Sequence, residues 1–234
     1  MIGQTFYTPQ YSISAQKCIE SMKKNGCDIA IAYKGELLEN QEILITQRGF
    51  GFWAWKPFII DLLLGNHTDA NEVFIYADAG VEVIDNLNYI VDRMDQDVFL
   101  FGNMWDARHW TKGDIYKAIG VEPNESKQTQ ASVIVLRNTE FSRKFISEWL
   151  FYCQIPQLIN DEPSIEPNHP EFRENRHDQA ILHVLSEKYG IKKHWWPAKY
   201  ITPHGSFIYE KGIYTDNYPV LFNHHRKKND EWQR

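Results

Sequence analysis

The sequence has few cysteines, and their spacing does not form a recognisable site. The 234 residues include only Cys18, Cys27 and Cys153, without a C-x-x-C pair. This pattern disfavours a disulfide framework and a structural zinc site. It favours a reducing compartment, so we expect a cytoplasmic protein.

Long apolar runs and an excess of basic residues are also missing. The opening residues MIGQTFYTPQ have neither the apolar core nor the basic flank of a signal peptide. The most apolar segment, residues 57–64, is too short to span a bilayer and contains Asp61. The net charge is −6, which disfavours nucleic acid as a partner. We therefore expect no membrane span and no nucleic-acid interface.

What remains is the composition of one globular domain over residues 1–234. Hydrophobic residues make up 43% and aromatic residues 14%, enough for a sizeable core. Apolar runs alternate with segments of helical periodicity, which predicts an α/β sheet covered by helices on both faces. Residues 154–172 read as a long surface loop and residues 227–234 as a mobile tail. Strands are expected over 27–35, 72–80, 97–103 and 131–138, and helices over 14–25, 55–65, 86–94, 139–153 and 176–190.

The stretch VFIYADAG, residues 73–80, ends an apolar strand on Asp78 among small neighbours. Ligands of open α/β sheets bind outside the carboxyl ends of strands. A divalent cation held by one carboxylate and by substrate phosphates would suit Asp78. The same letters also suit an aspartate that caps a turn, and this stretch alone does not decide between the two interpretations.

Four further segments carry charged or aromatic residues that suit a binding site. RGFGFWAWKP contains Arg48 and Lys56 between tryptophans, with glycines that let a ligand approach the backbone. RHDQ places Asp178 at a helix start, where an acid is also favoured by the helix dipole. FNHHRKKN contains two adjacent histidines that suit either a metal contact or an exposed tail. The fourth segment is HWTKGD, residues 109–114.

In their order along the chain, the segments RGFGFWAWKP, VFIYADAG, WTKGD, RHDQAILHVLSEKYG and HHR resemble a group of small glycosyltransferases with the GT-A nucleotide-diphospho-sugar transferase fold. Such enzymes occur in bacterial surface-polysaccharide clusters and in large algal (chlorella) viruses, where the compartment would be the host cytoplasm. The resemblance runs from about residue 45 to about residue 226. It implies a Rossmann-like, mixed and mostly parallel sheet. It also implies that residues 1–130 mainly bind the nucleotide sugar, and that residues 131–226 form the acceptor side and the C-terminal closure.

The chain departs from the family at the metal motif. GT-A enzymes usually carry Asp-x-Asp at this strand end, whereas Gly80 stands here in place of the second acid. The resemblance implies Mn²⁺ or Mg²⁺ on Asp78 with a C-terminal histidine, His224 or His225 first and His204 second. The donor-binding residues that it implies are Thr5, Tyr7, Thr8, Arg48, Lys56, Asp78, Ala79, Gly80 and Arg226.

The expected reaction moves a sugar from a UDP-sugar to a hydroxyl of a glycan or glycoprotein. Asp178 is the first candidate for the catalytic carboxylate, followed by Asp114 and Asp106. Retention of the anomeric configuration is favoured over inversion. Three alternatives stay open: a metal-dependent hydrolase, a carbohydrate-binding module and a degenerate transferase. Candidates for stacking on sugar rings are Trp105, Trp110, Trp195 and Trp196.

Overall fold

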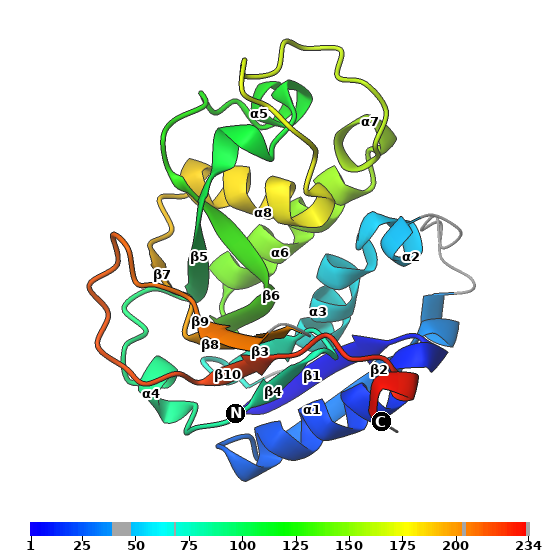
Figure 1. Cartoon of the computed structure of the whole chain (residues 1–234), viewed down its shortest axis with the longest axis vertical. Coiled ribbons are helices and arrows are strands. Elements are labelled where there is room, and N and C mark those ends of the chain that lie inside the picture. Colours follow the sequence, from blue (N-terminus) through cyan, green and yellow to red (C-terminus); the bar gives the residue numbers. More distant parts are fainter. Residues whose placement is uncertain (39–47, 68, 203–204, 233–234) are drawn as a thin grey trace.

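A six-stranded sheet forms the centre of the computed structural model, which describes residues 1–38, 48–67, 69–202 and 205–232 (Figure 1). The strand order is β2-β1-β3-β6-β5-β7, and neighbours are parallel except where β6 pairs with β3 and β5. The predicted mixed, mostly parallel sheet is confirmed. Its strands are β1 (Ile2–Tyr7), β2 (Ile29–Lys34), β3 (Val73–Ala77), β5 (Val98–Asp106), β6 (Lys127–Arg137) and β7 (Lys193–Trp195).

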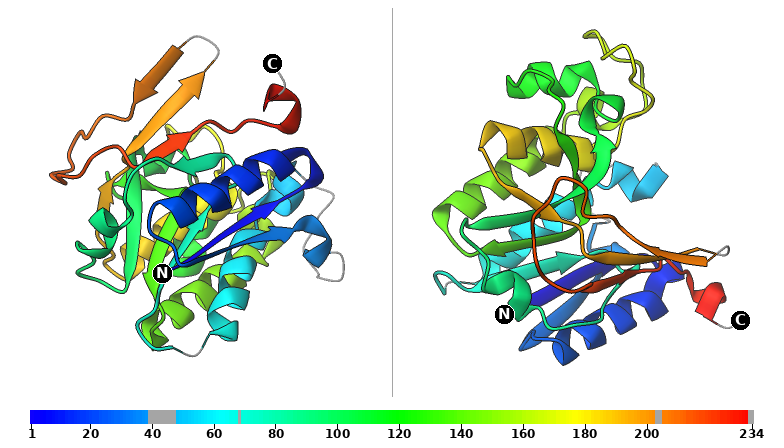
Figure 2. Two further views of the ribbon diagram at one scale, coloured as in Figure 1. Left: turned by 90° about the horizontal axis from the view of Figure 1, so that it is seen from below. Right: turned by 60° about the vertical axis from the view of Figure 1, so that its left-hand side comes forward.

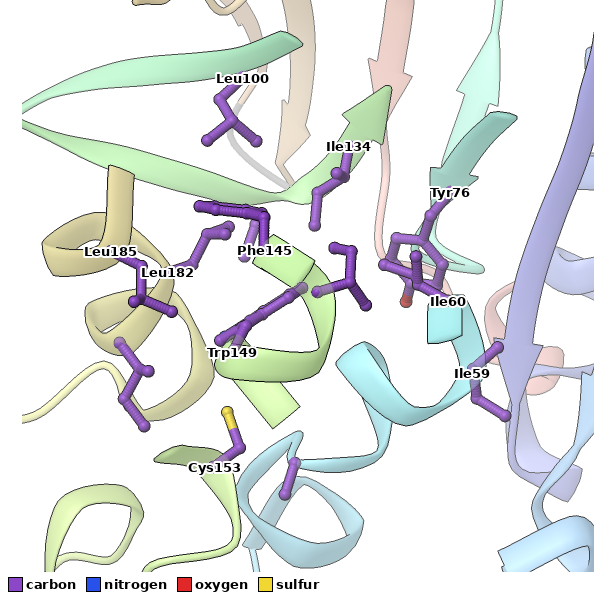
Figure 3. Packing of buried hydrophobic residues seen from close by; sticks show 14 of the residues in the cluster. Ile59, Ile60, Tyr76, Leu100, Ile134, Phe145, Trp149, Cys153, Leu182 and Leu185 are labelled. Carbon is purple, nitrogen blue, oxygen red and sulfur yellow. The ribbon is translucent and has the colours of Figure 1, made fainter. Parts of the chain in front are cut away.

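Three helices cover one face of this sheet, namely α3 (Trp55–Asn66), α6 (Glu140–Cys153) and α8 (His177–Lys188). From α6, Phe145 and Trp149 are fully buried and join Leu182 and Leu185 of α8 in one apolar cluster (Figure 3). Trp149 donates its indole N–H to the carbonyl of Asp178 at 2.9 Å. A buried indole with its donor satisfied fixes the start of α8 relative to α6.

Helix α1 (Ser12–Lys24) and a second, four-stranded sheet cover the opposite face (Figure 2). The second sheet has the order β4-β10-β8-β9 and consists of β4 (Val81–Val83), β8 (Ala198–Thr202), β9 (Gly205–Ile208) and β10 (Phe222–His224). In β10, His224 is the antiparallel partner of Val81. This pairing places the chain after residue 224 beside residues 78–80, which immediately precede β4.

The remaining elements are short. They are η1 (Pro9–Tyr11), η2 (Gly35–Leu38), α4 (Asn88–Val91), η3 (Ala107–His109), α5 (Gly113–Ile119), α7 (Pro156–Ile159) and η4 (Asn229–Trp232). Within the described residues, no helix is long and apolar enough to cross a bilayer.

The predicted strands and helices are found, with their ends within three residues of the expected bounds except at the start of β6. Strand β6 begins at Lys127, ahead of the expected residue 131, because the polar side chains of Gln128, Thr129 and Gln130 are buried in the sheet. The loop over residues 154–172 contains the short helix α7. Residues 227–232, expected to be mobile, pack on α1: Trp232 donates to Ser14 Oγ at 2.8 Å and Asn229 accepts from Ile13 N at 3.0 Å. Residues 233–234 lie outside the described part.

Candidate active site

A cleft of about 790 Å³ opens at the carboxyl ends of β1 and β3, the edge where α/β sheets bind ligands. Its walls come from the end of β1, residues 48–56, the end of β3, the middle of β6, the start of α8 and the segment after β10. Five cationic side chains line it against two carboxylates, although the whole chain has a net charge of −6. The cations are Arg48, Lys56, Arg176, Arg226 and Lys228, and the carboxylates are Asp78 and Asp178.

A buried lysine joins the two carboxylates. Lys56 Nζ lies 3.2 Å from Asp78 Oδ1 and 3.2 Å from Asp178 Oδ2, and it donates to the carbonyl of Ala131 at 3.1 Å. Burial lowers the pKa of Lys56, but attraction to both carboxylates outweighs burial, and the pKa is raised. Lys56 is therefore charged at neutral pH.

Asp178 has a raised pKa in this arrangement. Its carboxylate is almost completely enclosed, and burial raises its pKa to about 6 although Lys56 acts in the opposite direction. Repulsion from Asp78 contributes to the same upward shift. Asp178 is consequently ionised at neutral pH, but it binds a proton more readily than an exposed aspartate does. Such raised pKa values are common in functional sites.

Asp78 faces the cleft with 28% of its side chain exposed. Its Oδ1 accepts from the hydroxyl of Tyr76 at 2.6 Å. The following turn is closed by the backbone, because Val81 N donates to the carbonyl of Asp78 at 2.9 Å. Of the two interpretations that the sequence left open, this geometry favours a ligand-facing carboxylate over a turn cap.

Arg226 occupies the space beside Gly80. A Cβ atom on Gly80 would lie 2.6 Å from Arg226 Cα and 3.1 Å from Arg226 N, and Arg226 N donates to Gly80 O at 3.0 Å. Side-chain carbons essentially never approach backbone atoms so closely. The glycine at the second-acid position is therefore required by this contact with the C-terminal segment.

The two adjacent histidines face different surroundings. His224 lines the cleft, and its Nε2 accepts from Arg226 Nε at 3.0 Å. His225 packs against the ring of Trp232, with centroids 5.0 Å apart, and its Nδ1 accepts from Lys227 N. Burial lowers the pKa of His224 far below its usual value and that of His225 to about 4, so both rings are neutral.

These side chains do not present an open set of metal ligands. No group of three His, Cys, Asp or Glu residues suited to a metal exists in the described part of the chain. Lys56 and the hydroxyl of Tyr76 both contact Oδ1 of Asp78, which leaves Oδ2 for a cation. The Nε2 atom of His224 is occupied by Arg226, and its Nδ1 atom is buried without a partner. His204, the second candidate, lies outside the described residues.

Asp114 lies outside the cleft. Its carboxylate accepts from Glu166 N at 2.7 Å, Ile165 N at 3.0 Å and Gln157 Nε2 at 2.8 Å. Burial opposes ionisation, but these donors lower the pKa. Asp114 thus holds the loop that follows α7. Asp106 caps η3 by accepting from Arg108 N at 2.9 Å.

The other predicted contacts divide between the cleft and the core. Tyr7, Thr8, Arg48, Ala79 and Gly80 line the cleft. Thr5 is completely buried and does not. Of the tryptophans, Trp195 and Trp196 are buried. Trp105 is 50% exposed and meets Trp110 edge-on, with centroids 6.1 Å apart.

One wall of the cleft is a left-handed turn, which was not among the predicted elements. From Gly49 to Trp53, five consecutive residues have positive φ (63°, 57°, 92°, 53° and 61°). This segment, labelled α2 (Arg48–Phe52), is therefore not a right-handed helix. Left-handed conformations of non-glycine residues cost of order 1 kcal/mol each and cluster at functional sites. The alternating glycines of RGFGF were the available signal.

Besides Arg176, two residues at the start of α8 were not predicted as cleft residues. His177 has φ of 52°, and its Nδ1 lies 2.7 Å from the carbonyl of Ile159. Gln179 donates to Gln128 Oε1 at 2.9 Å. Both are part of RHDQ, where only Asp178 was singled out.

No family model and no curated protein matches this sequence. Solved structures do match, and they define the fold as that of the GT-A glycosyltransferases. Mouse xyloside xylosyltransferase 1 has a TM-score of 0.51 at 9% identity, over 97% of this chain and 98% of that one.

Two further structures have the same fold. The bifunctional glycosyltransferase WbbM has a TM-score of 0.57 at 11% identity, over 98% of this chain and 46% of its own. An active-site mutant of LgtC has a TM-score of 0.52 at 15% identity, over 97% of this chain and 88% of its own. At these identities, the similarity establishes the fold alone.

Proposed function

We propose that this chain is a glycosyltransferase that moves a sugar from a nucleoside diphosphate donor, UDP in the first instance, to a hydroxyl of a glycan or glycoprotein. The observation that carries the proposal is the cationic cleft at the carboxyl ends of β1 and β3, with Asp78 and Asp178 sharing the buried Lys56. Five cations against two carboxylates in an acidic protein suit a dianionic diphosphate. The GT-A fold supports the same class of donor.

The donor is proposed to lie with its nucleoside at the end of β1 and its diphosphate toward Arg226. Tyr7, Thr8, Arg226 and Lys228 all line the cleft. As the anomeric bond breaks, negative charge grows on the departing diphosphate. Fixed cations that stabilise this charge contribute the electrostatic part of catalysis, about 3 kcal/mol for a contact of this kind.

Asp178 is proposed to act at the sugar. It is ionised at neutral pH and fixed at the first turn of α8. In an inverting reaction this carboxylate takes the proton of the acceptor hydroxyl. In a retaining reaction, which is the outcome we expect, it stabilises the positive charge at the anomeric carbon. Retention and a cytoplasmic location stay predictions. The divalent metal expected from the resemblance is left out of the proposal, because the described residues offer no open set of ligands for it.

The acceptor is proposed to reach the cleft past Trp105 and Trp110. Arg176 lines the cleft and also lies over the ring of Trp110, with its guanidinium carbon 4.5 Å from the centroid. The half-exposed ring of Trp105 adjoins Trp110. An exposed indole next to a charged cleft suits the apolar face of a sugar ring.

Thermal-shift and turnover measurements test the proposal. UDP, GDP, CMP and TDP are screened with and without manganese, because a ligand at 100 times its Kd adds about 2.7 kcal/mol to stability. We expect UDP to raise the Tm and a UDP-sugar to be consumed faster with a glycan acceptor. Free sugar released at full rate without acceptor would indicate a hydrolase. Glycan binding without nucleotide binding would indicate a carbohydrate-binding module, and nucleotide binding without turnover would indicate a degenerate transferase.

A further inference from the structure

Position 80 is where a GT-A enzyme usually carries its second metal-binding acid, and here the backbone of Arg226 closes it. The separation of 2.6 Å between a Cβ on Gly80 and Arg226 Cα concerns backbone atoms. A rotamer change of Arg226 therefore does not make room. The segment is held in place by the bond from Arg226 N to Gly80 O and by the pairing of His224 with Val81.

The Arg226 side chain is oriented by two neighbours. Its Nε donates to Nε2 of the neutral His224 at 3.0 Å, and its guanidinium carbon lies 5.4 Å from the centroid of Tyr200. Neither neighbour is an acid. Among the described residues, Arg226 forms no ion pair, and its two terminal guanidinium nitrogens donate no hydrogen bond. The residue is exposed and lines the cleft, so its two terminal nitrogens are accessible to a ligand there.

The negative charge of Asp78 is already compensated by the ammonium group of Lys56. Lys56 is fully buried, reaches Asp78 at 3.2 Å and is held by Asp178 and the Ala131 carbonyl. A divalent cation on Asp78 would have to displace Lys56 or share the carboxylate with it at close range. Like charges at such a separation in a partly enclosed site repel by several kcal/mol.

From these contacts we propose that Arg226 binds the donor diphosphate directly, in the position usually taken by the second acid and its metal, so that nucleoside diphosphates bind without a divalent cation. A guanidinium fork matches two phosphate oxygens, which an ammonium group does not. This inference rests on the proposed function, because it assumes a nucleoside diphosphate donor.

Calorimetric titration of UDP, with GDP and TDP as further probes, tests the inference on the whole chain in EDTA and in excess manganese. We expect Kd values for the wild-type protein that agree within about threefold between the two conditions. Arg226→Gln removes the charge and leaves a shorter, neutral polar side chain, and its affinity should fall roughly 10- to 100-fold. Arg226→Lys should recover only part of the loss.

Lys227→Ala is the matched control, because Lys227 is the next cation along the chain but lies over the ring of Trp232, 4.4 Å from its centroid. It should bind UDP as the wild type does. Unchanged Tm values of the free variants show that each one folds.

Three results would overturn the inference, and they distinguish its failure from a failure of the proposed function. A wild-type affinity that rises tenfold or more with manganese shows that a metal holds the diphosphate and leaves the proposed function intact. Unchanged affinity in Arg226→Gln shows that another group does so. If UDP, GDP and TDP fail to bind under either condition, the proposed function fails as well.

Discussion

Replacing Asp178 with asparagine should make the protein more stable at neutral pH while removing its activity. The carboxyl pKa is raised from 3.8 to about 6 because the group is buried. Each pKa unit corresponds to about 1.4 kcal/mol. Ionised Asp178 therefore costs the folded state about 3 kcal/mol at pH 7, net of its attraction to Lys56. Asparagine resembles the protonated carboxyl group in shape and accepts from Lys56, so most of this cost should disappear.

The pH dependence of the stability difference between Asp178→Asn and the wild type shows whether the raised pKa of Asp178 causes it. A raised pKa means that the folded state holds the proton more tightly than the unfolded chain does. The favourable contribution of protonated Asp178 is fully present below pH 3.8 and is lost as the pH rises through about 6. Urea unfolding should show Asp178→Asn more stable than wild type by about 2 to 3 kcal/mol at pH 7.5, with the difference shrinking below pH 6 and vanishing near pH 4.

Asp114→Asn provides the matched control, because it is the same substitution at a carboxylate whose pKa is lowered by its donors. It should destabilise the protein at neutral pH, with the effect lost at acidic pH, and should leave the Kd for UDP unchanged. The reasoning fails if Asp178→Asn is less stable than wild type at pH 7.5, or if the difference between them does not change with pH. The first result would mean that attraction to Lys56 exceeds the cost of burial, and the second that the two effects cancel.

Three other substitutions test the contacts around the cleft. Lys56→Met should cost about 3 to 5 kcal/mol in urea unfolding at pH 7.5, because it leaves two carboxylates without their shared cation; a loss below 1 kcal/mol would contradict the charged state assigned to Lys56. Gly80→Ala should lower stability by about 1 to 3 kcal/mol and weaken UDP binding, since the new methyl group meets the backbone of Arg226; wild-type melting and affinity would show that the C-terminal segment moves freely. Trp105→Ala should raise KM for the glycan acceptor about tenfold or more, with KM for the donor unchanged, as expected for loss of about 1 to 3 kcal/mol of stacking. An equal effect on both constants would place Trp105 elsewhere in the mechanism.

The sequence predicts the parts of the fold that depend on local pattern. The apolar run of β3 and the helical periodicity of α1, α6 and α8 are properties of neighbouring residues, and they appear where expected. Strand β6 is predicted only in part because Gln128 and Gln130 read as exposed residues. Burial of the Gln128 amide becomes favourable because Gln179 of α8 donates to its Oε1 and the carbonyl of Trp110 accepts from its Nε2.

The candidate site depends on contacts between distant segments, which the sequence does not specify. Lys56, Asp78 and Asp178 are each recognisable near the end of an element, but only the insertion of antiparallel β6 between β3 and β5 brings α8 close to Asp78. The same holds for the histidines. Adjacent residues at a strand end face opposite sides, and nothing in the letters HH tells which of His224 and His225 faces the cleft.

The C-terminal segment has a consequence for how the protein can be handled. Residues 226 and 228 contribute cations to the cleft, while Asn229 and Trp232, one to four positions later, fasten the chain to the start of α1 (Figure 1). The residues that anchor the C-terminal segment and the residues that line the cleft therefore belong to the same short stretch of chain. An affinity tag or fusion partner joined at this end would disturb residues that line the cleft. One joined before β1 would lie at the amino end of that strand, away from the cleft.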